Sequence, residues 1–127
     1  MVVQRLADLR VDLDAPLTGD VLLTLRHGSL LLSAATFERY FSGLQSVLLL
    51  PREKSLLILP VQNSSGGNLV KVINPAGDRA VSGVELFRQF HLDDELIDGY
   101  REAIFEARWD DVCAALVIDG FFCETPA

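Results

Sequence analysis

Apolar and polar residues alternate with a period of two along much of the first half of the chain. Residues 9–13 place three apolar side chains between charged ones, which is typical of a strand with one solvated face. Residues 21–25 and 29–32 are two further apolar runs with only three residues between them. This spacing predicts a tight hairpin that turns at Gly28.

A second hairpin is predicted by residues 45–50 and 55–62, two strongly apolar runs that flank a charged turn at residues 51–54. Shorter runs at residues 68–74 and 79–81 predict two more strands. The pattern therefore predicts about six short, mostly antiparallel strands before residue 83.

Two helices are predicted around and after these strands. Ser33 is a suitable N-cap for a short helix over residues 34–42, and Gly43 suits the left-handed position that ends such a helix. Ser82-Gly-Val-Glu85 matches a capping box, in which each side chain accepts a hydrogen bond from a backbone amide of the other residue. A second helix is therefore expected to run to about Phe90.

The period changes to three and four residues from Asp93 onward, which predicts an amphipathic helix to about residue 107. Its apolar face consists of Leu96, Ile97, Tyr100, Ile104 and Ala107. A further helix is expected from about residue 109, although residues 112–118 also fit a strand. The sequence thus predicts one α+β domain over residues 1–127, with a strand-rich part (1–82) and an acidic helical part (83–127).

The hydrophobic content of the chain predicts an interface with another protein chain. Half of the 127 residues are hydrophobic, which exceeds what a monomer of this size buries easily. We therefore expect a protein partner or a homo-oligomer, most simply a homodimer. The apolar runs are far too short to cross a membrane, and the N-terminus lacks a signal-peptide pattern. A cytoplasmic protein is expected, and Cys113 and Cys123 are expected to be free thiols because their spacing fits neither a redox nor a zinc motif.

Negative charge is concentrated in the last third of the chain. Residues 1–84 contain eight Lys or Arg against seven Asp or Glu, whereas residues 85–127 contain three against eleven. Several of these acids have expected positions at helix starts, where the helix dipole favours them. The remaining acids and the nearby aromatic residues are candidates for binding a protein partner. The candidates are Glu95, Asp98, Glu102, Glu106, Trp109, Phe121 and Phe122. For Phe121 and Phe122, next to Trp109, packing against the strands in the core is the favoured alternative.

No catalytic or cofactor-binding motif occurs in the sequence, so we expect neither catalytic residues nor a cofactor. The leading hypothesis is a non-enzymatic accessory, assembly or regulatory protein that acts by protein–protein association. His91 with Asp93 and Asp94 offers imidazole and carboxylate ligands for a metal ion, which makes a small enzyme or metal-binding protein a further alternative. The same carboxylates are also explained as helix caps.

Residues 21–60 resemble the AbrB/MraZ swapped-hairpin family of small regulators. The resemblance lies in the order of a hairpin, the stretch Gly28-Ser-Leu-Leu-Leu-Ser33, a short helix containing Arg39, and two apolar strands that end at Pro60. Ser29 stands where the family has a basic residue, and Ser33 stands where it has a proline. The resemblance implies an intertwined dimer that binds DNA.

A DNA-binding alternative needs cations that neutralise phosphates. The candidates within this segment are Arg26, Arg39, Arg52 and Lys54, and Lys71 follows shortly after it. The net charge of −7 disfavours nucleic acid as a partner, because binders of nucleic acid usually have a high isoelectric point.

Overall fold

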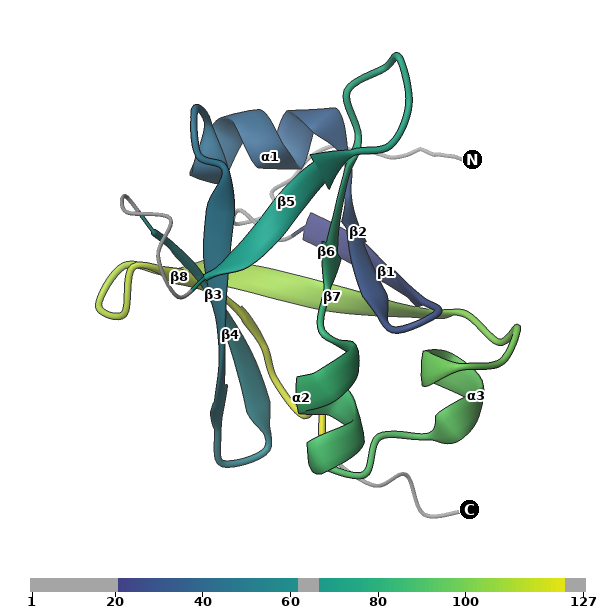
Figure 1. The fold of residues 1–127 in the computed structure, drawn as a ribbon. Helices are drawn as coiled ribbons and strands as arrows, with labels where there is room; N and C mark the ends of the chain where they lie inside the picture. Colours follow the sequence, from purple (N-terminus) through teal and green to yellow (C-terminus); the bar gives the residue numbers. More distant parts are fainter. Residues whose placement is uncertain (1–20, 62–66, 123–127) are drawn as a thin grey trace.

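The computed structural model describes residues 21–61 and 67–122, whose eight strands close into an antiparallel barrel (Figure 1). Around the barrel the strand order is β1, β2, β6, β5, β3, β4, β8 and β7, and β7 pairs with β1 to close it. The strands are β1 (Val21–Arg26), β2 (Ser29–Leu32), β3 (Ser46–Arg52), β4 (Ser55–Pro60), β5 (Asn68–Val72), β6 (Arg79–Ser82), β7 (Ala103–Asp110) and β8 (Ala115–Ile118). The helices are α1 (Ala34–Phe41), α2 (Val84–Gln89) and α3 (Asp94–Ile97).

The predicted α+β class with C-terminal helices is therefore wrong. The last third of the chain supplies β7 and β8, and each pairs with a strand from the first half of the chain. The proposed division near residue 83 does not separate two structural parts, because both sides of it contribute to the same barrel. No helix in the described ranges is long and apolar enough to span a membrane.

The first predicted hairpin is confirmed as β1 and β2. His27 and Gly28 have φ values of 52° and 75°, the pair of positive angles that a type I′ turn requires. The turn is also an anchor: the Gly28 amide donates to the Leu96 carbonyl, and the Gly28 carbonyl accepts from the Gly83 amide, both at 2.9 Å. The turn thus joins β1 and β2 to the segments that carry α2 and α3.

The helix after β2 is confirmed, together with both of its predicted ends. Ser33 Oγ accepts a hydrogen bond from the Thr36 amide at 3.1 Å, and Gly43 has a φ of 79°. The start of α1 has a second cap that the sequence did not indicate. Asp78, in the turn between β5 and β6, accepts from the Ala34 amide at 2.9 Å, so this distant turn is tied to α1.

The second hairpin, β3 and β4, and the strands β5 and β6 also confirm the sequence prediction. The helix predicted near residue 83 exists as α2, but the predicted capping box is wrong. The N-cap of α2 is Gly83, and no side chain caps it. Ser82 lies in β6, opposite Ser29 of β2, so its extended backbone holds it in the sheet ladder.

The prediction of two long C-terminal helices is wrong, because residues 103–118 consist of β7, a turn and β8. The helix at Asp93 ends at Ile97, after one turn capped by the Asp93 carboxylate. Beyond it the chain follows a period of two: Phe105, Ala107 and Trp109 are inward-facing residues of β7. The ambiguity over residues 112–118 is resolved as a turn followed by the buried strand β8. The ladder between β7 and β1 joins residues about eighty positions apart, and a local pattern does not reveal such pairing.

The core fills the barrel and continues to both of its ends. The buried inward-facing residues are Leu23, Leu25, Leu30, Leu32, Val47, Leu49, Leu56, Ile58, Val81, Ala107, Leu116 and Ile118. Phe37 and Phe41 of α1 join this cluster at one end. Phe87, Leu96 and Phe121 join it at the other, so the helices close the barrel as plugs (Figure 1). The predicted strand at residues 9–13 and Cys123 lie outside the described residues.

The anchoring role of Gly28 predicts a larger cost for an added methyl group there than at Gly43. Both glycines have positive φ, so Ala at either position is strained by about 1–2 kcal/mol. A Cβ at Gly28 would also lie 2.5 Å from Val84 Cγ2, whereas a Cβ at Gly43 meets nothing within 4 Å. We expect Gly28→Ala to lower the free energy of unfolding by about 1–3 kcal/mol more than Gly43→Ala, measured by urea denaturation. Equal losses would contradict the anchoring role.

Replacing Ser46 and Ser33 by alanine should change the free energy of unfolding in opposite directions. Ser46 is 1% exposed and its Oγ has no hydrogen-bond partner among the described residues, so Ser46→Ala should raise the free energy of unfolding by about 1 kcal/mol. Ser33→Ala removes the cap of α1 and should lower it by about 1 kcal/mol. The same urea titration measures both variants. A loss of stability in Ser46→Ala would show that its hydroxyl is satisfied in solution.

Candidate interaction surface

Exposed leucines gather on the outward face of β3 and β5. Side chains alternate between the two faces of a strand, so Leu48 and Leu50 point away from the core while Leu49 points into it. Leu48 is 37% exposed, Leu50 is 42% exposed, and Leu69 on β5 is 62% exposed. We call Leu48, Leu50 and Leu69 the aliphatic stripe.

The strand register makes these leucines neighbours. Leu69 lies opposite Ser46 of β3, which places it diagonally next to Leu48 on the same face. On the other side, Leu48 and Leu50 lie opposite Leu59 and Leu57 of β4. The stripe therefore continues, without an intervening charge on these strands, into a partly buried aliphatic surface.

The backbone edge beside the stripe is unsuited to pairing with another strand. Within the described residues, β3 pairs with β5 only at Ser46 and Val47, so the rest of β3 has no strand neighbour on that side. Arg52 and Ser55 are the hydrogen-bonded pair that closes the two-residue loop of the hairpin. In an antiparallel ladder the next pair, Pro51 and Leu56, is not hydrogen-bonded, so the backbone N and C=O of Pro51 point away from β4. Proline has no N–H to offer at this edge. An added strand would find no donor at Pro51, whereas the side chains of the stripe are open to a partner.

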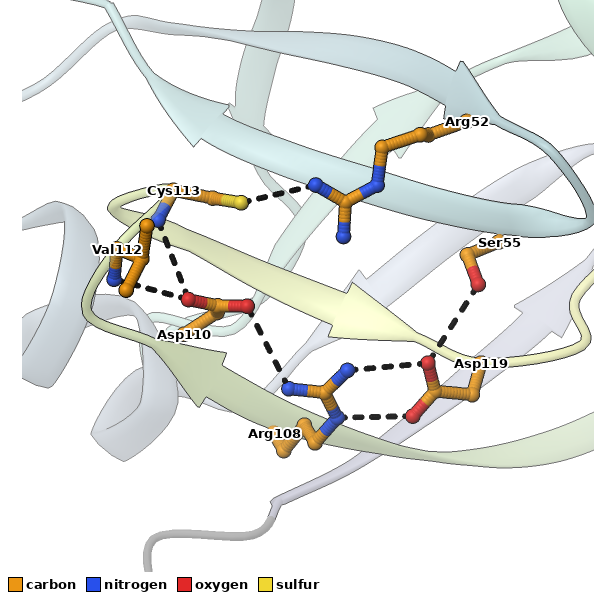
Figure 2. A network of polar contacts seen from close by, with 7 residues as sticks. All are labelled: Arg52, Ser55, Arg108, Asp110, Val112, Cys113 and Asp119. Carbon is orange, nitrogen blue, oxygen red and sulfur yellow. Dashed lines mark hydrogen bonds and ion pairs between the residues drawn. The ribbon is translucent and has the colours of Figure 1, made fainter.

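A polar network lies next to this surface, on the outward face of β4, β8 and β7 (Figure 2). Arg52, at the end of β3, donates from Nη1 to Cys113 Sγ at 3.0 Å, and this contact raises the pKa of Arg52. Because Cys113 lies in the turn between β7 and β8, the Arg52 side chain passes across β4 to reach it. Beneath this network lies a small apolar cluster that faces outward but is buried, formed by Leu57, Ala115 and Val117.

Arg108 and Asp119 form the other half of the network. Arg108 donates from Nε and Nη2 to the two Asp119 oxygens at 2.8 and 3.1 Å, and its Nη1 lies 3.6 Å from Asp110 Oδ2. The Arg108 contact lowers the pKa of the Asp119 carboxyl. Ser55 Oγ donates to the same carboxylate at 3.5 Å (Figure 2). These groups bind one another, which suits a structural role in covering the outward apolar cluster.

Asp110 caps the turn between β7 and β8, where the sequence suggested a helix cap. Its Oδ1 accepts from the amides of Val112 and Cys113 at 2.9 and 3.2 Å. These amides lower the pKa of the Asp110 carboxyl, and the Cys113 amide has the largest effect. The turn leaves the Val112 side chain 95% exposed.

The predicted acidic helical face does not exist. Asp98 pairs with Arg88 through two hydrogen bonds of 2.8 and 3.1 Å, which lower the pKa of its carboxyl. Glu102 pairs with Arg26 at 3.1 Å. Glu95 lies on the single turn of α3, and Glu106 lies on the outward face of β7. Ion pairs within the chain thus occupy part of the acidic surplus.

The aromatic candidates are mainly packing residues. Trp109 stacks on Tyr40 of α1 with ring centroids 4.8 Å apart. Phe121 is 2% exposed and packs against Phe87, while Phe122 is half-buried beside it. For Phe121 the interface prediction is wrong, because its side chain is part of the core.

The cations proposed for DNA binding do not lie on one face. Arg39 is on α1, Arg26 ends β1 beside the turn that contacts α3, and Arg52 ends β3. Arg26 is paired with Glu102 and Arg52 with Cys113. Lys54 lies in the turn between β3 and β4, beyond one end of the aliphatic stripe.

The His91 hypothesis finds no support in the geometry. Among residues 21–61 and 67–122, no group of three or more His, Cys, Asp and Glu side chains is placed to hold a metal ion. Asp93 caps α3 through the Glu95 amide and also pairs with Arg101. His91 follows α2 with a φ of 60°.

A second exposed apolar pair lies on the β1–β7 wall, which we define as Leu22, Ile104 and Glu106. Leu22 is 62% exposed and Ile104 is 68% exposed, and the register places Glu106 directly opposite Leu22. A hollow of about 340 Å³ beside them is lined in part by Ile104, Glu106, Arg108 and Asp119.

The sequence analysis missed both surfaces because it gave residues 21–25, 45–50 and 68–74 only as strands and placed Ile104 on the apolar face of a helix. The signal was present for β3, where Val47, Leu48, Leu49 and Leu50 are consecutive. A strand with one solvated face would have a polar residue at every second position. An uninterrupted apolar run indicates that its outward side chains are either covered by another part of the chain or available to a partner.

The ion pair of Arg108 with Asp119 predicts a pH titration that can be followed by carboxyl-carbon NMR. Because the folded pKa of Asp119 lies below its unfolded value, the pair stabilises the fold above about pH 4 and is lost as the pH falls through the folded pKa. In Arg108→Gln the midpoint of Asp119 should rise toward its ordinary value, while that of Asp98 stays low. Arg88→Gln should have the reverse effect. A common shift of both carboxyls in either variant would contradict independent pairs.

No protein-family model, no curated protein and no solved structure matched the chain. The resemblance to the AbrB/MraZ family therefore has no support beyond the residues that suggested it.

Proposed function

We propose that the protein is a non-enzymatic accessory, assembly or regulatory protein that acts by protein–protein association through the aliphatic stripe. The observation that carries this proposal is the exposure of Leu48, Leu50 and Leu69 side by side on one face of the barrel. Single exposed leucines are ordinary on protein surfaces, whereas adjacent ones on regular strands are typical of interaction sites.

The rigidity of the platform supports the proposal. The stripe lies on paired strands, and Leu49 between Leu48 and Leu50 is fixed in the core at 7% exposure. A partner therefore meets leucines whose backbone positions are already set. Less conformational entropy is lost on binding to such a surface than on binding to a loop.

The polar groups of the described residues favour a binding role over catalysis. Arg108, Asp119 and Asp110 are used in the network over β8, and Asp78 and Ser33 are used to cap α1. Each of these groups contacts another part of the chain and stabilises a turn or a helix end.

Polar substitutions in the stripe should weaken association and leave the fold intact. We expect Leu50→Gln or Leu69→Gln to weaken association about tenfold, since burial of part of a leucine contributes about 1.4 kcal/mol. The measurement is quantitative cross-linked capture of associated chains from the native host, including other copies of this chain. Thermal unfolding of each variant serves as the fold check.

Val112→Gln is the matched control, because Val112 is 95% exposed but lies on the turn between β7 and β8, away from the stripe. It should capture the same set of chains as the wild type. The proposal fails if the stripe variants also capture that set at wild-type levels.

A further inference from the structure

We infer that the aliphatic stripe of one molecule docks on the β1–β7 wall of a second copy, in a head-to-tail contact. This inference rests on the proposed function and names the partner. Its first support is position. In the closed strand order, β5 and β3 are separated from β1 and β7 by two strands on either side, so the two surfaces lie on opposite sides of the barrel.

The two surfaces match in apolar character. The stripe offers Leu48, Leu50 and Leu69, and the wall offers Leu22 and Ile104, each more than 60% exposed. Leu22 lies opposite Glu106, two residues beyond Ile104 on β7, so Leu22 and Ile104 are diagonal neighbours on the outward face. The hollow beside Ile104 gives the wall a concave part that can receive a leucine of the stripe.

Among the described residues, the charges that lack an ion-pair partner beside the two surfaces are opposite in sign. Lys71 lies on the outward face of β5, two residues from Leu69, and Lys54 lies beyond the other end of the stripe. These are the chain's two lysines, and within the described residues neither side chain has an ion-pair partner. On the wall, Glu106 is exposed and likewise has no ion-pair partner in the described part of the chain.

A symmetric contact between two stripes is disfavoured by the same charges. It would bring the cationic ends of one stripe against the cationic ends of the other, because Lys54 and Lys71, beyond its two ends, outnumber Glu53, the carboxylate in the same turn as Lys54. Like charges placed opposite one another across an interface disfavour the contact. The wall of a second copy offers Glu106 to these cations.

The net charge of −7 does not prevent the contact. At physiological ionic strength, charges more than about 8 Å apart are largely screened, so the groups at the interface decide. Each molecule has both a stripe and a wall, and a contact between different surfaces leaves one of each free at the ends of a dimer. Assembly therefore grows with protein concentration instead of stopping at two copies.

Complementary variants test this inference by sedimentation velocity, from about 5 to about 500 µM, a range that brackets weak dissociation constants. The stripe variant is Leu50→Gln with Leu69→Gln, and the wall variant is Leu22→Gln with Ile104→Gln. Wild type and Val112→Gln should form species that grow with concentration. Each double variant alone should remain monomeric, while an equimolar mixture should form a dimer that grows no further. Thermal unfolding confirms that each variant is folded.

A charge exchange provides a second test. Lys71→Glu and Glu106→Lys should each weaken self-association about tenfold, and mixing the two variants should restore part of it, because the exchanged charges then face each other. Raising the salt concentration should weaken the wild-type contact.

Two outcomes overturn the inference. A wild type that stays monomeric over the whole range removes the second copy as partner, while cross-linked capture by the stripe still tests the proposed function separately. A wild-type dimer of constant size that is lost in the stripe variant and kept in the wall variant would show a symmetric contact.

Discussion

Closure of the barrel by β7 is the constraint on which the other features depend. This strand pairs with β1 on one side and with β8 on the other, and without it the sheet would have two open edges. Closure also decides which side chains face outward on every strand. The aliphatic stripe and the β1–β7 wall lie on opposite sides of the molecule because the strand order, once closed, places β3 and β5 across from β1 and β7.

The ends of the barrel are closed by a different kind of contact. At one end, α1 is capped by its own Ser33 and by the distant Asp78, so the turn between β5 and β6 is fastened to the helix. At the other end, the Gly28 amide donates to Leu96 of α3, and the Gly28 carbonyl accepts from Gly83 at the start of α2. Hydrogen bonds from turns thus position helices that are too short to be stable alone.

Sequence patterns predicted the elements whose signals are local. Both hairpins, α1 with its Ser33 cap, and the strands β5 and β6 follow from alternation and turn residues. The patterns failed from Asp93 onward, because Leu96, Tyr100 and Ile104 are spaced as on a helix while the pairing that decides the structure comes from β1. The interaction surface was missed for a related reason. Whether the Leu48 side chain is buried or exposed depends on what covers the outer face of the barrel, and the residues next to Leu48 in the sequence do not show this.

Pro51 has a consequence for solubility. Water-exposed leucines on a strand usually carry a risk of aggregation, because a second chain can add its backbone to the sheet beside them. The pairing of Pro51 with Leu56 places the missing amide at the open side of β3, where an incoming strand would need a donor. An incoming strand would therefore lose one backbone hydrogen bond at Pro51, which lowers the tendency of the exposed leucines to start a sheet between chains.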